Sequence, residues 1–450
     1  MTDAPAHTHP LLVSPPLPTL LRLAAPNALA MGASTVVSIA ETAYIGALGA
    51  APLAAAALVF PMIMLMNMMS GGAMGGGVSS AISRALGAGA HARAEDLARH
   101  AAYLGFGLGI AFLILMLAFG RPLYALLGGR GEALTAAIGY SGIVFFAAVN
   151  IWLAAMFSSI LRAQGDMLSP SMTLLSTAVV QIALGGALCF GLGPFPQLGI
   201  VGVGLGQVIS TGVSALVMFA LLRRKRATVK LRLSGQLRAD LFADILRVGL
   251  PACLSPIQSV LTVLVVTAVA ARFGTETLAG YGIGARLEFL LIPIAFAFGV
   301  ASLPMVGLAV GAGDIPRARR VAWTAGALAG AIVGALGILV AIFPDLWARI
   351  FTDNQAIRDA TAGYLRIVGP CFSVFGVGLA LYFSSQGAGR VLGPILAGTA
   401  RLVVVALGGW YLISTDAPAW GLFVVVALGM LAYGGGTALS VLLTPWRKAG

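Results

Sequence analysis

Two acidic side chains lie deep inside long apolar stretches of this sequence, where charged residues are rare. Of the fifteen Asp and Glu residues, only Glu41 and Glu288 fall well within a stretch long enough to span a membrane. A carboxylate at membrane depth is costly unless it is protonated, paired or hydrated. Both residues are therefore candidates for cation coupling, in which uptake and release of a proton drive the movement of another solute.

Glu41 shares one face of its predicted helix with other polar side chains. Ser34, Ser38 and Tyr44 lie at helical spacing from it on an otherwise apolar segment. This stripe is expected to face a cavity or a polar network. The alternative is a structural carboxylate held by the neighbouring hydroxyl groups.

Glu288 has little polar company on its own helix. The residues one turn away from it are Gly284, Ala285, Leu291 and Ile292. Arg286 is the only arginine that we place well inside a span, but residues two apart on a helix point to nearly opposite sides. Any partner of Glu288 is therefore expected to come from another span, in a structural ion pair or in a coupling site.

Further polar side chains inside the apolar stretches are candidates for lining a substrate cavity, together with Ser34, Ser38 and Tyr44. They are Asn67, Asn150, Gln181, Gln207 and Ser259. Hydrogen bonding between helices explains such residues equally well.

The composition is that of a membrane protein. Hydrophobic residues make up 59% of the chain and charged residues 9%, and the mean hydropathy is +0.98. A soluble protein would carry roughly a quarter charged residues. The sequence therefore predicts an all-α polytopic membrane protein in contact with the lipid bilayer.

Apolar runs of about 20 residues are long enough to cross a bilayer, and twelve are predicted. They cover residues 20–47, 52–83, 100–120, 135–161, 170–192, 198–222, 246–272, 278–310, 321–344, 361–386, 393–413 and 418–444. Within the second run, the glycines of GGAMGGG (71–77) favour close helix packing over a hinge.

The two halves of the sequence repeat one another at half the chain length. Pro26, Gly49, Leu53, Ala54, Tyr140 and Pro170 recur as Pro251, Gly274, Leu278, Ala279, Tyr364 and Pro394. Because each half holds an even number of spans, both halves enter the membrane in the same direction. This predicts two six-helix lobes related by a pseudo-two-fold axis along the membrane normal.

The domain organisation follows from these runs and from the distribution of Lys and Arg. We predict a disordered head (1–19), a first lobe (20–222), a basic cytoplasmic interlobe linker (223–245), a second lobe (246–444) and a tail (445–450). Most of the 27 basic residues fall on the side of the two termini, which places both termini in the cytoplasm of a bacterial-type cell (inner) membrane. The same bias explains the net charge of +12 without nucleic acid.

No motif for an enzyme, a cofactor or a metal is evident. The sequence lacks a phosphate-binding glycine loop with Lys-Ser/Thr, and its four histidines are divided between the head and one predicted loop. We therefore expect a carrier without catalytic residues, cofactor or metal, acting as a monomer.

Several ordered motifs resemble the multidrug and toxic compound extrusion (MATE) family. They are ETAYIGALGAAPLAAAALVFP (41–61), RALGAG (84–89), RAQGDMLSP (162–170) and VGAGD (310–314). The resemblance covers nearly the whole chain. It implies two six-helix lobes enclosing a cleft that opens alternately to either side, and export of cationic amphipathic small molecules driven by inward H⁺ or Na⁺ flow.

The resemblance also suggests which residues act. Family members commonly carry an Asp in span 1 where this chain has Glu41, and an Asn and an Asp early in span 5, where the best matches are Gln181 and Gly185. Members that use Na⁺ in the second lobe carry acids in spans 7 and 10, where this chain offers Ser259 and no acid. Proton coupling is therefore favoured over Na⁺.

Two other transporter classes remain open. A lipid-linked oligosaccharide flippase of the same superfamily would share the helices but should have a more cationic cleft. A major-facilitator carrier also has six plus six spans, but its usual loop between spans 2 and 3 does not match RALGAGAHARAED (84–96).

Overall fold

The computed structural model describes residues 9–224, 228–415 and 417–446. Twelve helical segments in this part of the chain are long and apolar enough to cross a membrane, and no strand is present there. The predicted spans are thereby confirmed in number, with boundaries that differ by a few residues at most ends. Span 11, predicted at 393–413, is the helix α17 (Leu392–Ser414).

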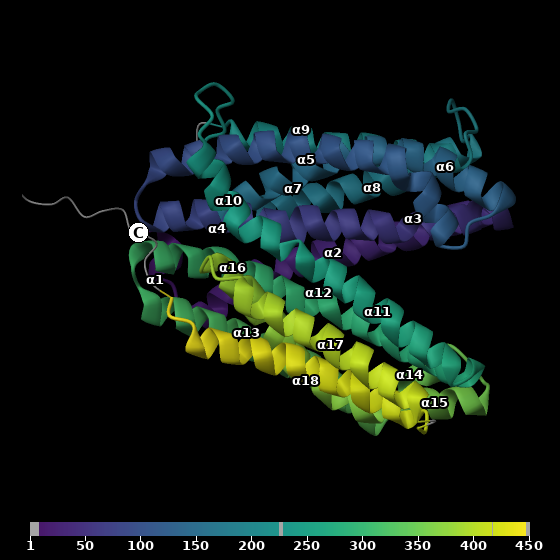
Figure 1. The fold of residues 1–450 in the computed structure, drawn as a ribbon. Helices are drawn as coiled ribbons and strands as arrows, with labels where there is room; N and C mark the ends of the chain where they lie inside the picture. Colours follow the sequence, from purple (N-terminus) through teal and green to yellow (C-terminus); the bar gives the residue numbers. More distant parts are fainter. Residues whose placement is uncertain (1–8, 225–227, 416, 447–450) are drawn as a thin grey trace, which may run out of the picture. The chain divides into compact units, whose positions relative to one another are not determined.

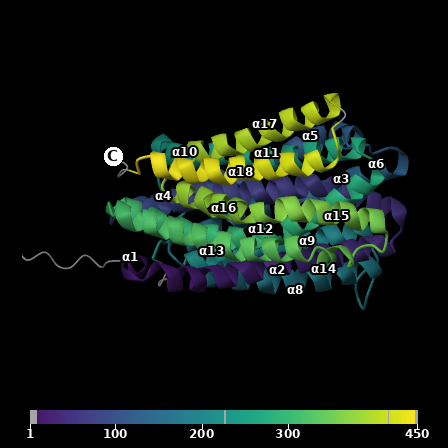
Figure 2. The ribbon, with the colours of Figure 1, turned by 90° about the horizontal axis from the view of Figure 1, so that it is seen from below.

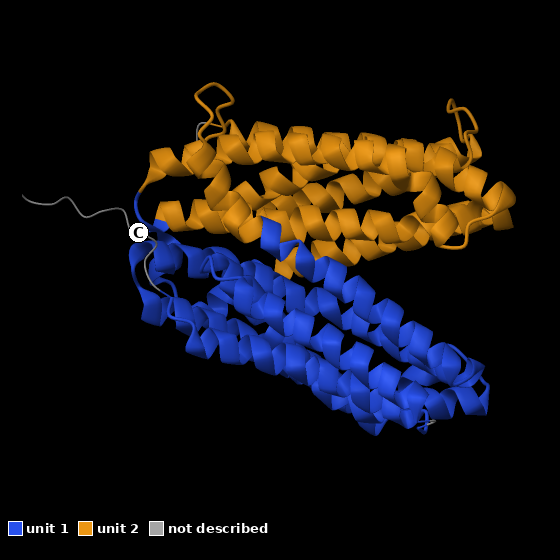
Figure 3. Cartoon of the chain, in the orientation of Figure 1, with its two compact units in different colours: residues 1–24, 87–89, 250–450 blue, residues 25–86, 90–249 orange. Residues whose placement is uncertain are grey.

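The chain divides into two compact units, coloured in Figure 3. Unit 2 comprises residues 25–86 and 90–249, and unit 1 comprises residues 1–24, 87–89 and 250–450. The chain passes between units beside the repeat-related Pro26, which is inside α2 (Pro16–Ala47), and Pro251, which is inside α10 (Ala239–Ala252). Each unit thus includes a short segment that the sequence analysis assigned outside that lobe.

Unit 2 contains most of α2 and α10 and the helices between them (Figure 1). These are α3 (Ala50–Asn67), the π-helix η1 (Met68–Met74), α4 (Gly75–Gly87), α5 (His91–Leu126), α6 (Gly131–Phe146), α7 (Ala148–Ala163), α8 (Leu168–Phe190) and α9 (Ile200–Leu222). Helix α9 packs against α6, α7 and α8, and its most extensive contact is with α8.

Unit 1 contains the remaining helices, and Figure 2 shows α17 and α18 lying side by side. They are α1 (Pro10–Val13), α11 (Leu254–Arg272), α12 (Thr275–Ala312), α13 (Ile315–Ile342), α14 (Asp345–Ala348), α15 (Gln355–Val368), the 3₁₀ turn η2 (Gly369–Cys371), α16 (Phe372–Gly387), α17 and α18 (Trp420–Leu443). Helix α16 is central, because it contacts α12, α13 and α18.

The prediction of a disordered head is wrong for residues 10–13 and 16–19, which are helical. Prolines at the first position of α1 and α2 are compatible with a helix, because their missing N–H is not needed there. The Arg317 guanidinium of α13 donates hydrogen bonds to the carbonyl oxygens of Leu11 (2.7 Å) and Ser14 (2.5 Å). Residues 1–8 of the predicted head lie outside the described residues.

The predicted interlobe linker is only partly a linker. Residues 239–245 form the first half of α10 and belong to unit 2. The backbones of α4 and α10 meet at two glycines, since a Cβ on Gly77 would lie 2.8 Å from the Cα of Gly249. Part of the glycine run 71–77 therefore serves helix packing, whereas Gly71 has open space and lies in the π-helix.

Candidate functional site

Glu41 receives a hydrogen bond from an amide on a neighbouring helix. The Gln181 Nε2 of α8 donates to Glu41 Oε1 at 2.7 Å, and the Ser210 hydroxyl of α9 donates to Gln181 Oε1 at 3.1 Å. Glu41 and Gln181 are half-buried, and Ser210 is 1% exposed. Three helices thus form a polar chain that ends on the carboxylate, and within the described residues no cation pairs with Glu41.

Small residues bring these three helices together. A Cβ on Gly206 of α9 would lie 2.8 Å from the Cα of Gly185 on α8, so the two backbones are in direct contact there. One turn beyond Gly206, Ser210 can therefore reach Gln181. Gly186 leaves room for the Tyr44 ring of α2, since a Cβ at that position would be 3.1 Å from Tyr44 Cζ.

Tyr44 itself is a packing residue in this arrangement. Its ring meets Phe190 edge to face at a centroid distance of 5.7 Å, which fixes α2 against the end of α8. A second tyrosine, Tyr140 of α6, lies within electrostatic range of Glu41. The environment of Glu41 therefore contains an amide, a hydroxyl and aromatic rings.

Two further predicted residues support the same bundle of helices. Asn150 Nδ2 of α7 donates to the Val208 carbonyl of α9 at 3.2 Å. The buried Gln207 accepts bonds at its carbonyl from the hydroxyls of Ser210 (3.1 Å) and Thr211 (2.7 Å). Asn150 therefore joins α7 to α9, whereas the bonds of Gln207 lie within α9. Neither residue contacts Glu41 through a hydrogen bond that the structure shows.

The remaining predicted cavity residues bond within their own helices. Ser34 donates to the Ala30 carbonyl (3.2 Å) and Ser259 to the Ser255 carbonyl (3.0 Å). The main-chain oxygens of Ser38 and Asn67 accept from Thr42 (2.7 Å) and Ser70 (3.3 Å). Glu41 is thus joined to the neighbouring helices through Gln181. Among the described residues, Ser34 and Ser38 make no hydrogen bond to Glu41 or Gln181.

Glu288 of α12 forms an ion pair with Arg401 of α17, a different span as expected. Arg401 Nη2 lies 3.1 Å from Glu288 Oε1, and the two side chains are only 13% and 14% exposed. The Arg401 guanidinium also lies over the Phe375 ring, at 5.0 Å from its centroid. Tyr281 and Tyr364 are within electrostatic range of Glu288. This carboxylate is thus neutralised and largely enclosed by protein.

The prediction that Arg286 is the only arginine well inside a span is wrong. Arg401 lies near the middle of α17 and within the predicted span 393–413, so its position was a usable signal that was missed. Arg286 is exposed and lies over the Phe351 ring at 5.2 Å. The positive charge that serves Glu288 therefore comes from a helix more than a hundred residues further along the chain.

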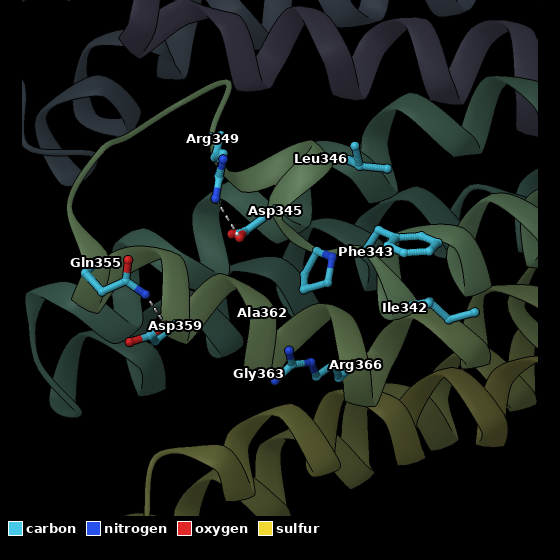
Figure 4. A pocket seen from close by; sticks show the side chains of 11 residues that line it. Ile342, Phe343, Asp345, Leu346, Arg349, Gln355, Asp359, Ala362, Gly363 and Arg366 are labelled. Atoms are coloured by element: carbon cyan, nitrogen blue, oxygen red, sulfur yellow. Dashed lines mark hydrogen bonds and ion pairs between the residues drawn. The ribbon is translucent and has the colours of Figure 1, made fainter.

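A separate cavity of about 670 Å³ lies at the end of α13, between the segment 342–349 and α15 (Figure 4). Its acids are already engaged: Asp345 pairs with Arg349 (3.4 Å) and Arg358 (2.9 Å), and Asp359 accepts from Gln355 (2.8 Å). The hydrogen bond from Arg358 holds the pKa of Asp345 below its ordinary value. None of the sequence-predicted site residues lines this cavity.

Comparison with known proteins decides the family. The MatE family model matches residues 26–185 and 251–411, one stretch in each half of the sequence. The chain belongs to the MATE family. The two matched stretches begin at the repeat-related Pro26 and Pro251, so the family model recognises the same duplication as the sequence repeat.

Named relatives of this MATE chain are transporters. It is 26% identical over 406 residues to the FAD transporter of Shewanella oneidensis, which covers 89% of this chain and 88% of that protein. It is 25% identical to the multidrug export protein MepA of Staphylococcus aureus, over 78% of each chain. As a MATE family member with twelve candidate membrane spans among its described residues, this chain is a multi-pass membrane transporter and not an enzyme.

Solved structures agree on the fold. A MOP superfamily transporter from Pyrococcus furiosus superposes with a TM-score of 0.87 at 25% identity, covering 97% of this chain and 99% of that one. An outward-facing MATE family multidrug resistance transporter gives a TM-score of 0.88 at 24% identity, covering 97% of both chains. The predicted twelve-helix, two-lobe MATE fold is thereby confirmed.

Proposed function

We propose that this MATE transporter is a secondary active antiporter that exports cationic amphipathic compounds in exchange for H⁺, with Glu41 as the coupling carboxylate. The observation that carries the proposal is the pairing of Glu41 with a neutral amide instead of a cation. A carboxylate without a fixed counter-charge can be neutralised by a proton or by a cationic substrate, and the two then compete for it. We place the protein in a bacterial cell membrane as a monomer with both termini in the cytoplasm.

The amide network supports a proton more than Na⁺. A dehydrated metal cation requires several oxygen ligands, but Gln181 turns its Nε2 donor toward Glu41 and its oxygen toward Ser210. When Glu41 is protonated, it becomes a donor and favours the opposite orientation of the Gln181 amide. Ser210 suits both orientations, because it can accept from Gln181 while donating to the Gln207 carbonyl 3.1 Å away.

The cycle that follows couples one proton to one export step. Protonation of Glu41 from the outside removes the negative charge that holds a cationic substrate, and the substrate leaves outward. The protonated carrier then returns to the inward-open state and releases its proton to the cytoplasm. A change in the charge of Glu41 alters the orientation of the Gln181 amide and thereby its hydrogen bond with Ser210 on α9.

Reconstitution in proteoliposomes tests the assignment. We expect Glu41→Gln to lower drug-driven H⁺ exchange by about a hundredfold or more, since the proton-carrying group is lost. The matched control is the double variant Glu288→Gln/Arg401→Gln, which removes the other intramembrane acid together with its partner and should retain exchange. Full exchange in Glu41→Gln would show that the coupling group lies elsewhere.

An anionic aromatic cargo is the second candidate. The FAD transporter relative matches 89% of this chain. Counterflow of a fluorescent organic cation and of FAD, each under separate proton and Na⁺ gradients, distinguishes the two cargoes and the two ions. Export of FAD alone would overturn the cationic assignment.

A lipid-linked oligosaccharide flippase is less well supported, because Arg401 is already neutralised by Glu288.

A further inference from the structure

The segment that joins α9 to α10 is tied to unit 2 along its whole described length. We call residues 228–238 the strap. Its amides at Val229, Lys230 and Arg238 donate to side chains of Gln164 (2.9 Å), Glu95 (3.4 Å) and His100 (2.8 Å). Its carbonyls at Leu233, Ser234 and Gln236 accept from Tyr103 (3.1 Å) and Arg99 (3.2 and 3.1 Å). Side chains of α5 supply most of these bonds, so the strap is a fitted part of unit 2.

One of these side chains, His100, has a defined protonation state. Its Nδ1 lies 2.7 Å from the Asp96 carbonyl oxygen, which can only accept, so Nδ1 carries the hydrogen. Its Nε2 accepts the Arg238 N–H at 2.8 Å, so Nε2 has no hydrogen. His100 is 0% exposed, and its ring meets Phe242 of α10 edge to face at 4.7 Å. The imidazole is therefore neutral and bonded at both nitrogens.

The charged groups around His100 do not stabilise a protonated, positively charged imidazole. On α5, the Asp96 carboxylate is paired with Arg99 at 2.7 Å. On the strap and α10, the Arg238 guanidinium is paired with Asp240 at 2.9 Å. Nearby carboxylates are thus matched by arginines, and both arginines oppose a further positive charge. A proton on Nε2 would also face the Arg238 N–H, which is itself a donor.

We propose that His100 is a positioning residue that holds the end of the strap at Arg238 as a neutral imidazole and releases that end when the imidazole is protonated. Protonation converts His100 Nε2, which accepts from the Arg238 amide, into a donor, and this bond between the end of the strap and α5 is lost. The strap leads directly into α10, whose Asp244 is held by Arg84 (2.8 Å) and Arg93 (2.9 Å). Acidification on the side that we assign to the cytoplasm would therefore loosen the connection before α10, while its arginine contacts remain.

Hydrogen exchange measured by mass spectrometry on the full chain in lipid nanodiscs tests this proposal. Exchange of residues 228–238, corrected for the intrinsic effect of pH, is followed from about pH 7.5 to about pH 5.5, the range in which a free imidazole titrates. Because release takes up one proton, protection should fall on acidification, by up to about tenfold per pH unit. Constant protection in the wild type would overturn the proposal.

Two variants identify the responsible group. His100→Gln keeps an oxygen that can accept the Arg238 N–H but does not titrate, so protection should become independent of pH. His91→Gln, an exposed histidine on the same helix, should keep the wild-type profile. A pH-dependent loss in His100→Gln equal to that of the wild type would assign the effect to another group. These readouts are independent of substrate and coupling ion, so failure of the proposed antiport would leave them unchanged.

Discussion

The two intramembrane carboxylates differ in the partner that each receives from the fifth helix of its half. Glu41 accepts from the neutral Gln181 on α8, whereas Glu288 pairs with the charged Arg401 on α17. In the repeat, Arg401 lies seven residues beyond Pro394, as Thr177 lies seven beyond Pro170. Gln181 lies eleven beyond Pro170, and its counterpart is Val405. The same helix face therefore carries an amide in one half and a cation one turn earlier in the other.

Because of this difference, Glu41 is free to gain or lose a proton, whereas the charge of Glu288 is balanced by Arg401. An amide stabilises a carboxylate without neutralising it, so a proton or a cation still gains from binding there. An enclosed guanidinium already supplies the counter-charge, and removing either member leaves the other uncompensated. The duplication thus provides two similar scaffolds, of which we assign coupling to the first and structural pairing to the second.

The largest expected effect on stability is at the enclosed pair. Arg401→Leu leaves Glu288 without its counter-charge at 14% exposure, and we expect a loss of about 3–5 kcal/mol in the free energy of unfolding. Thermal unfolding in detergent micelles measures it. The double variant Glu288→Leu/Arg401→Leu should recover most of the loss, because no buried charge remains. A single variant as stable as the wild type would mean that the pair is hydrated, and the contrast with Glu41 would then weaken.

Much of this contrast was accessible from the sequence. Hydropathy placed the twelve spans, and the scarcity of acids inside them singled out Glu41 and Glu288. Resemblance to the MATE family then pointed to Gln181, whose amide donates a hydrogen bond to Glu41 in the structure. These features depend on composition and local order along the chain, which a single sequence contains.

The pairings between distant segments were less accessible. Arg401 was available as a charge inside a predicted span, but helical periodicity does not state which helices are neighbours. The helix at residues 10–13 depends on Arg317, more than three hundred residues away, and the strap depends on side chains of α5. Both segments are rich in proline or charge and short of apolar periodicity, so local pattern alone favoured disorder or a linker.

A smaller effect is expected where glycine contact assembles the Glu41 network. Gly206→Ala introduces a Cβ 2.8 Å from the Cα of Gly185, so α8 and α9 must separate. We expect a loss of about 1–3 kcal/mol, typical of overpacking, together with weaker H⁺ coupling, because Ser210 moves away from Gln181. Gly139→Ala on α6 is the matched control, since a Cβ there meets nothing within 4 Å. Equal free energies of unfolding for both variants would show that α8 and α9 can separate without loss of stability.

The smallest effect is expected at the end of the polar chain. Ser210→Ala removes the partner of Gln181 Oε1, and the loss of one hydrogen bond should cost about 0.5–1.5 kcal/mol. Its effect on H⁺ exchange discriminates between two roles of the amide. If Gln181 reverses when Glu41 is protonated, Ser210 is needed as donor in one state and as acceptor in the other, and Ser210→Ala should slow exchange. Ser210→Thr keeps both functions and should restore it. Unchanged exchange in Ser210→Ala would mean that Gln181 keeps one orientation throughout the cycle and that the carboxylate acts without relaying its charge to α9.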